Sequence, residues 1–253
     1  MAASIDPKTT AATALACLDL TSLNDADTPA DIDKLCARAR GPHGRTAAVC
    51  VWPRFAAQAR ALLPPEVAVA AVANFPDGSS DIARAVADTR AIVDAGAQEV
   101  DVVIPYRDLD TAPALLAAVR AACPGLRLKV ILETGELQDP ALITRACRIA
   151  RAAGADFLKT STGKTAVSAT PAAAALLLQA IAADPAARGR VGFKPAGGIR
   201  TVADAAAYIA LVVEHLGEGA VTPARFRIGA SGLLNDIEAV LGGGARPATP
   251  ATY

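Results

Sequence analysis

Histidine is scarce in this chain, since His43 and His215 are the only two among its 253 residues. Neither stands at the end of a β-rich run, and His215 falls in a predicted helix, where a surface position is typical. A histidine-bound metal or a Ser-His-Asp triad needs more partners than these two residues can supply. The sequence therefore argues against both kinds of site.

Cysteine is also sparse and shows no pairing pattern. The five cysteines form no CxxC pair, and their number is odd; they are Cys17, Cys36, Cys50, Cys123 and Cys147. Reduced thiols in the cytosol fit this pattern better than a disulfide framework does. We therefore expect a cytoplasmic protein.

An excess of one charge is missing as well, because Lys plus Arg and Asp plus Glu both number 25. With no basic stripe, nucleic acid and anionic membranes are poor partners. The first ten residues contain no apolar run that would suggest a signal peptide. The most apolar stretch, at 172–183, is too short to span a bilayer. We expect neither a nucleic-acid nor a membrane partner.

Short β-rich runs alternate with longer, alanine-rich amphipathic stretches along the whole chain. The predicted strands cover 17–20, 47–52, 67–73, 99–104, 126–132, 156–160, 191–195 and 225–230. Helices fill most of the intervals, for example 80–95 and 139–153. A capping residue followed by Pro starts two of the helices, at Asp139-Pro140 and Thr170-Pro171. Gly96 and Gly154 follow helical runs, where a left-handed cap is favoured.

Eight strands alternating with helices predict a closed (β/α)₈ TIM barrel, an α/β fold, over residues 1–241. A doubly wound open sheet is the alternative, but it usually has fewer strands, and its GxGxxG turn is absent. From Gly242 onward the composition predicts a flexible C-terminal tail, 242–253.

The segment "DFLKTSTGKT" (156–165) ends like a nucleotide-binding P-loop but is not one. A P-loop needs glycine five residues before its Gly-Lys pair, so that bare amides can wrap the phosphates. Gly163 and Lys164 provide the end of the motif, whereas Leu158 occupies the position of that glycine. The nucleotide-binding interpretation is therefore rejected.

Side-chain alternation sorts each predicted strand into an apolar face and a charged face. The apolar faces suit packing against helices, which sends the charged side chains into the barrel. These inward residues are predicted to be Asp19, Asp101, Lys129, Glu133, Lys159 and Lys194. Charged groups are rarely buried unless they are paired or functional, so structural ion pairs are the alternative.

Paired lysines suggest a nucleophilic amine, which attacks a carbonyl only when it is neutral. Lys159 and Lys194 end neighbouring strands at the rim where barrel enzymes carry their chemistry. A second ammonium about 6 Å away lowers a lysine pKa by about two units at an effective dielectric of about 20, and burial lowers it further. Asp101 can reach the same centre as a proton acceptor.

The loops after the last two strands predict a phosphate site, as is frequent in such barrels. Their glycines let the backbone approach an anion, while Arg200 and Lys164 add positive charge. The loop residues in question are Gly163, Gly197, Gly198, Gly229, Ser231 and Gly232. Ordinary turns are the alternative for either loop taken alone.

With these residues considered, the chain resembles the deoxyribose-phosphate aldolases, which are class I (Schiff-base) aldolases. The matching motifs run in one order over nearly the whole chain. They are "LDLTSLND" (18–25), "EVDVVIPY" (99–106), "LKVILETGEL" (128–137), "GADFLKTSTGK" (154–164), "VGFKPAGGIR" (191–200), "RIGAS" (227–231) and the terminal Tyr253. One departure is Gly232, where family members often carry a second serine.

The resemblance implies a (β/α)₈ barrel that reversibly cleaves 2-deoxyribose 5-phosphate without a cofactor or metal. Lys159 then corresponds to the Schiff-base lysine, Lys194 to the lysine that perturbs its pKa, and Asp101 to the proton-relay acid. Tyr253 is expected to assist the proton step from the tail. Residues expected near the substrate also include Asp19, Thr21 and Thr160.

Two rival functions stay open at this point. One is another Schiff-base barrel enzyme, such as a transaldolase-like or keto-acid aldolase. The other is a non-catalytic sugar-phosphate sensor, which would be expected to have lost the amine or its partners. The expected partners are a sugar phosphate and small aldehydes. For the oligomeric state, a homodimer is the hypothesis.

Overall fold

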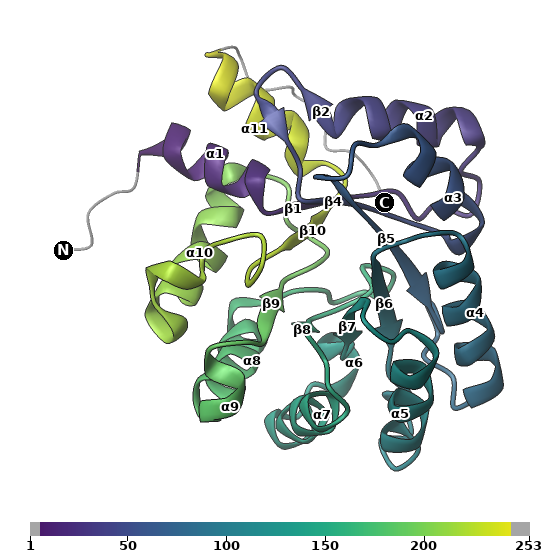
Figure 1. The fold of residues 1–253 in the computed structure, drawn as a ribbon. Coiled ribbons are helices and arrows are strands. Elements are labelled where there is room, and N and C mark those ends of the chain that lie inside the picture. Colours follow the sequence, from purple (N-terminus) through teal and green to yellow (C-terminus); the bar gives the residue numbers. More distant parts are fainter. Residues whose placement is uncertain (1–5, 244–253) are drawn as a thin grey trace.

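The computed structural model describes residues 6–243, which form eight parallel strands surrounded by helices (Figure 1). The barrel strands are β1 (Leu18–Thr21), β4 (Ala48–Val51), β5 (Ala68–Ala73), β6 (Glu99–Val103), β7 (Arg127–Ile131), β8 (Phe157–Lys159), β9 (Gly192–Lys194) and β10 (Ile228–Ala230). A small hairpin of β2 (Arg40–Gly41) and β3 (Gly44–Arg45) stands apart from them. The predicted barrel fold is confirmed.

Helices follow the strands on the outside of the barrel. They are α1 (Pro7–Ala16), α2 (Pro29–Arg38), α3 (Pro53–Leu62), α4 (Ile82–Asp94), α5 (Ala112–Ala122), α6 (Thr134–Leu137), α7 (Pro140–Ala152), α8 (Pro171–Ala182), α9 (Pro185–Arg188), α10 (Val202–Leu216), the 3₁₀ turn η1 (Glu218–Ala220) and α11 (Leu233–Gly242). Asp139 and Thr170 cap α7 and α8 as predicted, each with Pro at the first helical position. Gly96 and Gly154 adopt the predicted left-handed conformation, at φ 73° and 81°.

The barrel closes between the β9 side of the sheet and the segment that leads into and includes β10. The ladder order is β10-β1-β4-β5-β6-β7-β8-β9, and parallel bridges then join Phe193 to Phe226 and Ala196 to Gly229. The predicted strand 225–230 is regular only over Ile228–Ala230, yet the Phe193 amide donates to Arg225 O at 2.9 Å and the Arg227 amide donates to Phe193 O at 3.1 Å. Closure leaves the eight-stranded sheet without a free edge, and almost every residue of the barrel strands is buried.

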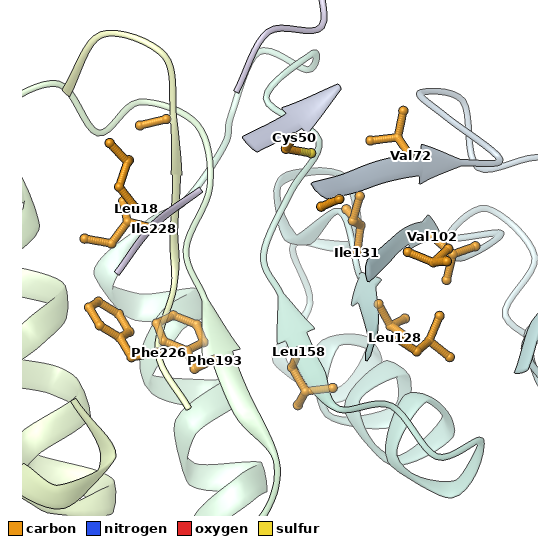
Figure 2. Close-up of a cluster of buried hydrophobic side chains, with 14 of the residues drawn as sticks. Leu18, Cys50, Val72, Val102, Leu128, Ile131, Leu158, Phe193, Phe226 and Ile228 are labelled. Atoms are coloured by element: carbon orange, nitrogen blue, oxygen red, sulfur yellow. The ribbon is translucent and has the colours of Figure 1, made fainter. Parts of the chain in front are cut away.

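The outward faces of the strands form the apolar layer that holds the helices. Figure 2 shows part of this layer together with the inward-facing Cys50, Val72 and Ile131. In the layer, Phe193 and Phe226 stack at a centroid distance of 6.4 Å. Val102, Leu128 and Leu158 continue it along β6, β7 and β8, and all three are fully buried. The predicted outward parity of Val102 and Leu128 is therefore confirmed, and it fixes which side chains enter the barrel.

The inward positions of β4 and β5 are small, which leaves room for long charged side chains from the other strands. Cys50 pairs with Ala70, and Ala70 pairs with Glu99, so these three share the inner face. The barrel is therefore filled asymmetrically, with short side chains on one side and Lys, Arg and Glu on the other.

The C-terminal end of the described chain is helical up to Gly242, and Gly243 caps α11 at φ 69°. Gly242, the first residue of the predicted tail, is thus the last residue of this helix. Tyr253 lies outside the described residues. In residues 6–243, no helix combines the length and apolarity needed to cross a membrane.

Candidate active site

The candidate site lies inside the barrel, where strand register places charged residues side by side. Asp101 of β6 is level with Lys129 of β7, and Lys159 of β8 is level with Lys194 of β9. All four side chains are buried, and Lys159 retains only 3% exposure. The structure thus brings together the predicted amine, its neighbouring lysine and the carboxylate.

Asp101 is the centre of this arrangement, because its two oxygens contact three lysines. Its Oδ2 accepts hydrogen bonds from Lys159 Nζ and Lys194 Nζ, both at 2.8 Å, and its Oδ1 accepts one from Lys129 Nζ at 2.6 Å. These ammonium groups outweigh the effect of burial and hold the pKa of Asp101 well below its usual range. Asp101 is therefore ionised and positioned between the two catalytic candidates.

Asp19 contacts the network from β1. Its Oδ2 accepts a hydrogen bond from Lys194 at 2.5 Å, and its Oδ1 accepts one from Arg227 at 2.6 Å. Both oxygens are thus engaged inside the barrel, although the sequence interpretation had grouped Asp19 with residues near the substrate. In this position Asp19 holds Lys194, and the two aspartates raise the pKa of that lysine against the effect of burial.

Lys159 differs from its neighbours in the direction of its pKa shift. Burial lowers the pKa of its ammonium, Asp101 opposes that change, and Lys194 adds to it. The sequence argument gave the neighbouring lysine the leading role, and here that weighting is corrected. Asp101 lies between the two ammonium groups and offsets their repulsion, so burial is the larger cause.

Lys159 is the cation of the buried cluster whose charge is least supported. Within residues 6–243, the buried carboxylates around it are Asp19, Glu99, Asp101 and Glu133, and the fully or almost fully buried cations are Lys129, Lys159, Lys194 and Arg227. Carboxylate partners raise the pKa of Lys129, Lys194 and Arg227, whereas the pKa of Lys159 is lowered. Lys159 is therefore the residue that can supply a neutral amine.

Glu133 anchors the loop after β8 rather than joining the lysine network. It has a left-handed backbone at φ 54°, and its carboxylate accepts hydrogen bonds from Thr162 Oγ1 at 2.5 Å and Thr165 Oγ1 at 3.3 Å. The expectation that it projects among the lysines is therefore corrected. Burial raises the pKa of this carboxyl.

Thr160 joins the loop after β8 to the loop after β9. Its hydroxyl accepts a hydrogen bond from the Ala196 amide at 3.0 Å, while Ser161 Oγ donates to the Ala196 carbonyl at 2.7 Å. Gly197 packs so closely that a Cβ would lie 3.0 Å from Gly163 Cα. Thr21, in contrast, donates to its own strand, at Asp19 O, at 2.8 Å.

In the loops after β9 and β10, only some of the backbone amides form hydrogen bonds within the protein. The Gly229 amide donates to Pro195 O at 2.9 Å, and the Gly197 amide donates to Gly229 O at 3.3 Å. A Cβ on Gly229 would also lie 3.1 Å from Lys194 Cε, so this glycine makes room for the lysine stem. Both amides therefore serve barrel closure.

Other amides of these loops remain available. In the described part of the chain, no hydrogen bond is found for the amides of Gly198, Ser231 and Gly232. Gly232 is the N-cap of α11 and provides no side-chain cap. The N-terminus of this ten-residue helix therefore presents donors at the same end of the barrel as Lys159. Lys164 and Arg200 are exposed on the adjoining loops.

Sequence reasoning missed Arg227 as part of the site and gave Glu99 no role. Arg227 Nη2 donates to Glu99 Oε1 at 2.8 Å, and Glu99 Oε2 contacts Lys129 Nζ at 2.6 Å. The same period-two argument that placed Asp101 could have found both residues. Arg227 and Gly229 share a face, as do Glu99 and Asp101.

The site is built for amine chemistry. Residues 6–243 contain no group of three or more His, Cys, Asp or Glu side chains placed to hold a metal ion. A buried amine that is biased toward its neutral form, beside an ionised carboxylate at the C-terminal end of a barrel, can attack a carbonyl. This layout defines a barrel enzyme suited to Schiff-base chemistry.

Comparison with known proteins gives the family. Residues 13–237 match the model of the DeoC/LacD family aldolases. The chain is 50% identical over 254 residues to the deoxyribose-phosphate aldolase of Agrobacterium fabrum, covering 97% of this chain and 96% of that protein. The chain belongs to the DeoC/LacD aldolase family.

Solved structures agree with this assignment. A proposed deoxyribose-phosphate aldolase from Toxoplasma gondii ME49 superposes with a TM-score of 0.86 at 25% identity, covering 94% of this chain and 96% of that one. Another, from Coccidioides immitis, gives a TM-score of 0.76 at 29% identity, covering 89% and 85%. The resemblance seen in the sequence motifs is therefore confirmed.

Proposed function

We propose that this aldolase reversibly cleaves 2-deoxyribose 5-phosphate to acetaldehyde and glyceraldehyde 3-phosphate through a Schiff base on Lys159. The observation that carries the proposal is the shared carboxylate, with Lys159 and Lys194 both 2.8 Å from Asp101 Oδ2. The substrate follows from the family and from the identity to a deoxyribose-phosphate aldolase over nearly the full chain.

The reaction begins with the neutral amine of Lys159 attacking the open-chain aldehyde, and water leaves as the iminium forms. The C2–C3 bond then breaks, and its electron pair moves toward the iminium nitrogen to give an enamine. The C3 hydroxyl loses its proton in this step. Asp101, which its lysine neighbours keep ionised, can accept that proton directly or through water.

Acetaldehyde is released when the enamine carbon is protonated and the resulting iminium is hydrolysed. Lys194 stays charged in this scheme, because Asp101 and Asp19 raise its pKa above the ordinary value. It orients Asp101 and supports the neutral state of Lys159. A proton donor from Tyr253 and a homodimeric assembly stay predictions.

Borohydride trapping with acetaldehyde tests this proposal. Reduction of the Schiff base is expected to add one two-carbon unit to the peptide that carries Lys159, as read by mass spectrometry. Because Lys159 is the lysine with the lowered pKa, Lys194 should stay unmodified. Modification of Lys194 instead would reverse the two roles, and no adduct at all would contradict the mechanism.

The phosphate is proposed to lie between the loops after β9 and β10. Three features support this placement: the unused amides of Gly198, Ser231 and Gly232, the N-terminus of α11, and the exposed cations Lys164 and Arg200. Gly232 provides no hydroxyl, so backbone amides and these cations would carry the binding.

Replacing Arg200 or Lys164 with Ala should therefore weaken phosphorylated substrates selectively. Each charge-assisted contact is worth roughly 1.5–3 kcal/mol, which corresponds to about a ten- to a hundredfold loss in kcat/KM. Rates with small unphosphorylated aldehydes should stay the same. Arg190→Ala is a matched control, since this arginine precedes β9 and pairs with Asp156. An equal loss for both substrate types would place the two cations elsewhere.

A further inference from the structure

The ion network in the barrel extends well below the residues that the reaction uses. From Lys159 it passes through Asp101 to Lys129 at 2.6 Å, and from Lys129 to Glu99 at 2.6 Å. Glu99 then contacts Arg227 at 2.8 Å and Arg127 at 2.6 Å. These contacts form an unbroken series from the candidate nucleophile to the N-terminal end of the barrel.

The lower part of this network is buried almost as completely as the site itself. Glu99 is 1% exposed and Arg227 is 3% exposed. Arg127 alone reaches solvent, with a side chain 36% exposed, beside a cavity of about 390 Å³ that Arg45 and Arg227 also line. Water therefore screens only the outermost charge, and the inner charges act through a medium of low polarity.

Other charged or titratable groups face these residues from every neighbouring strand. Around Glu99 and Arg227 they are Asp19 and Cys17 near β1, and Arg127 and Lys129 of β7; around Lys159 they are Cys50 of β4, Asp101 of β6, Lys194 of β9 and Glu133. Burial raises the pKa of both thiols, so neither contributes charge near neutral pH. The charges that remain are those of the carboxylate and cation network.

We propose that Glu99 and Arg227 are positioning residues that set the charge of Lys159 from the opposite end of the barrel. Glu99 acts with Asp101 to keep Lys129 protonated against the effect of burial, and Arg227 pairs with both Glu99 and Asp19. Through this series of contacts the charges of Glu99 and Arg227 act on Lys129 and Asp101, and through Asp101 on the proton of Lys159. This role rests on the proposed function of Lys159 as the nucleophile.

Single substitutions that change the charge of this lower network should shift the pH dependence of Schiff-base formation in opposite directions. The acid limb is the low-pH range over which the trapping rate falls because Lys159 becomes protonated. Glu99→Gln removes a negative charge and so lowers the pKa of Lys159, which moves this acid limb to lower pH. Arg227→Gln removes a positive charge, so that limb is expected at higher pH. A unit charge about 10 Å away at an effective dielectric of about 20 shifts a pKa by roughly one unit, and each limb should move by on the order of one pH unit.

The double variant Glu99→Gln/Arg227→Gln separates charge from damage to the fold. It removes one charge of each sign, so the acid limb should return to within about 0.3 pH unit of the wild type. Arg225→Gln is a matched control from the same segment, because this arginine bonds to the carbonyls of Val191 and Arg188 outside the network. Its limb should not move.

Arg127→Met provides a test that still applies if Glu99→Gln or Arg227→Gln fails to fold. It removes the partly exposed cation beside Glu99, and the limb should move to higher pH by less than for Arg227→Gln. The inference is overturned if the folded variants keep the wild-type limb, or if Glu99→Gln and the arginine variants shift it in the same direction. Absence of an acetaldehyde adduct on Lys159 in the wild-type enzyme would instead overturn the proposed function, so the two failures are distinguishable.

Discussion

Replacing Lys159 with Met is expected to abolish borohydride trapping and to lower turnover of 2-deoxyribose 5-phosphate by at least about 10⁴-fold, or roughly 5.5 kcal/mol of transition-state stabilisation. Methionine has a similar length but no amine, so no iminium can form. The check is the single-turnover rate together with the mass of the borohydride-treated protein. Trapping that persists in Lys159→Met would show that another lysine is the nucleophile.

The same variant should fold normally, which distinguishes loss of chemistry from loss of structure. A neutral Lys159 contributes one hydrogen bond to Asp101 rather than a charge, and Asp101 keeps Lys129 and Lys194 as donors. The free energy of unfolding should therefore change by less than about 2 kcal/mol. Lys34→Met on the surface of α2 is a suitable control, since that lysine side chain is 76% exposed.

Replacing Lys194 with Leu is expected to cost both activity and stability. Lys194 donates to Asp19 and Asp101, and all three groups are fully buried. Its removal leaves two carboxylates with too little positive charge, and breaking a buried pair in this way costs roughly 3–5 kcal/mol. Denaturant unfolding should show this loss for Lys194→Leu but not for Lys159→Met.

The effect of Lys194→Leu on catalysis follows from the sign of its charge. Lys194 lowers the pKa of Lys159, and without it the opposing effect of Asp101 on that pKa is larger. The Lys159 pKa should therefore rise, so that less neutral amine is present near pH 7 and the pH–rate profile for Schiff-base formation moves to higher pH. An unmoved profile in the folded variant would contradict electrostatic tuning by Lys194.

Local rules were sufficient for the order of elements and for the faces of the strands. The Asp139-Pro140 and Thr170-Pro171 signals start α7 and α8 because capping and a fixed proline φ act within one helical turn. Alternation along β6 and β7 placed Asp101 and Lys129 inside the barrel, because side chains in a strand repeat every two residues. The motifs were also sufficient to identify the aldolase family.

The partners of each charge could not be predicted in the same way. Alternation assigns a face but not a neighbour across the barrel, and Arg227 is 208 residues from Asp19 in the sequence. Barrel closure brings them together, and it also uses the amides of Gly197 and Gly229. Glu133 was misplaced for a related reason, since its left-handed backbone turns it away from strand geometry.

The sequence by itself determined an eightfold alternation of strands and helices, the inward lysines and aspartates, and the family. Only the tertiary structure decided that Asp101 lies between Lys159 and Lys194, and that burial rather than lysine repulsion is the larger cause of the lowered Lys159 pKa. The physical reason is that desolvation and ion pairing depend on distances across the closed barrel. Those distances are set by strand register and closure, which are long-range properties of the chain.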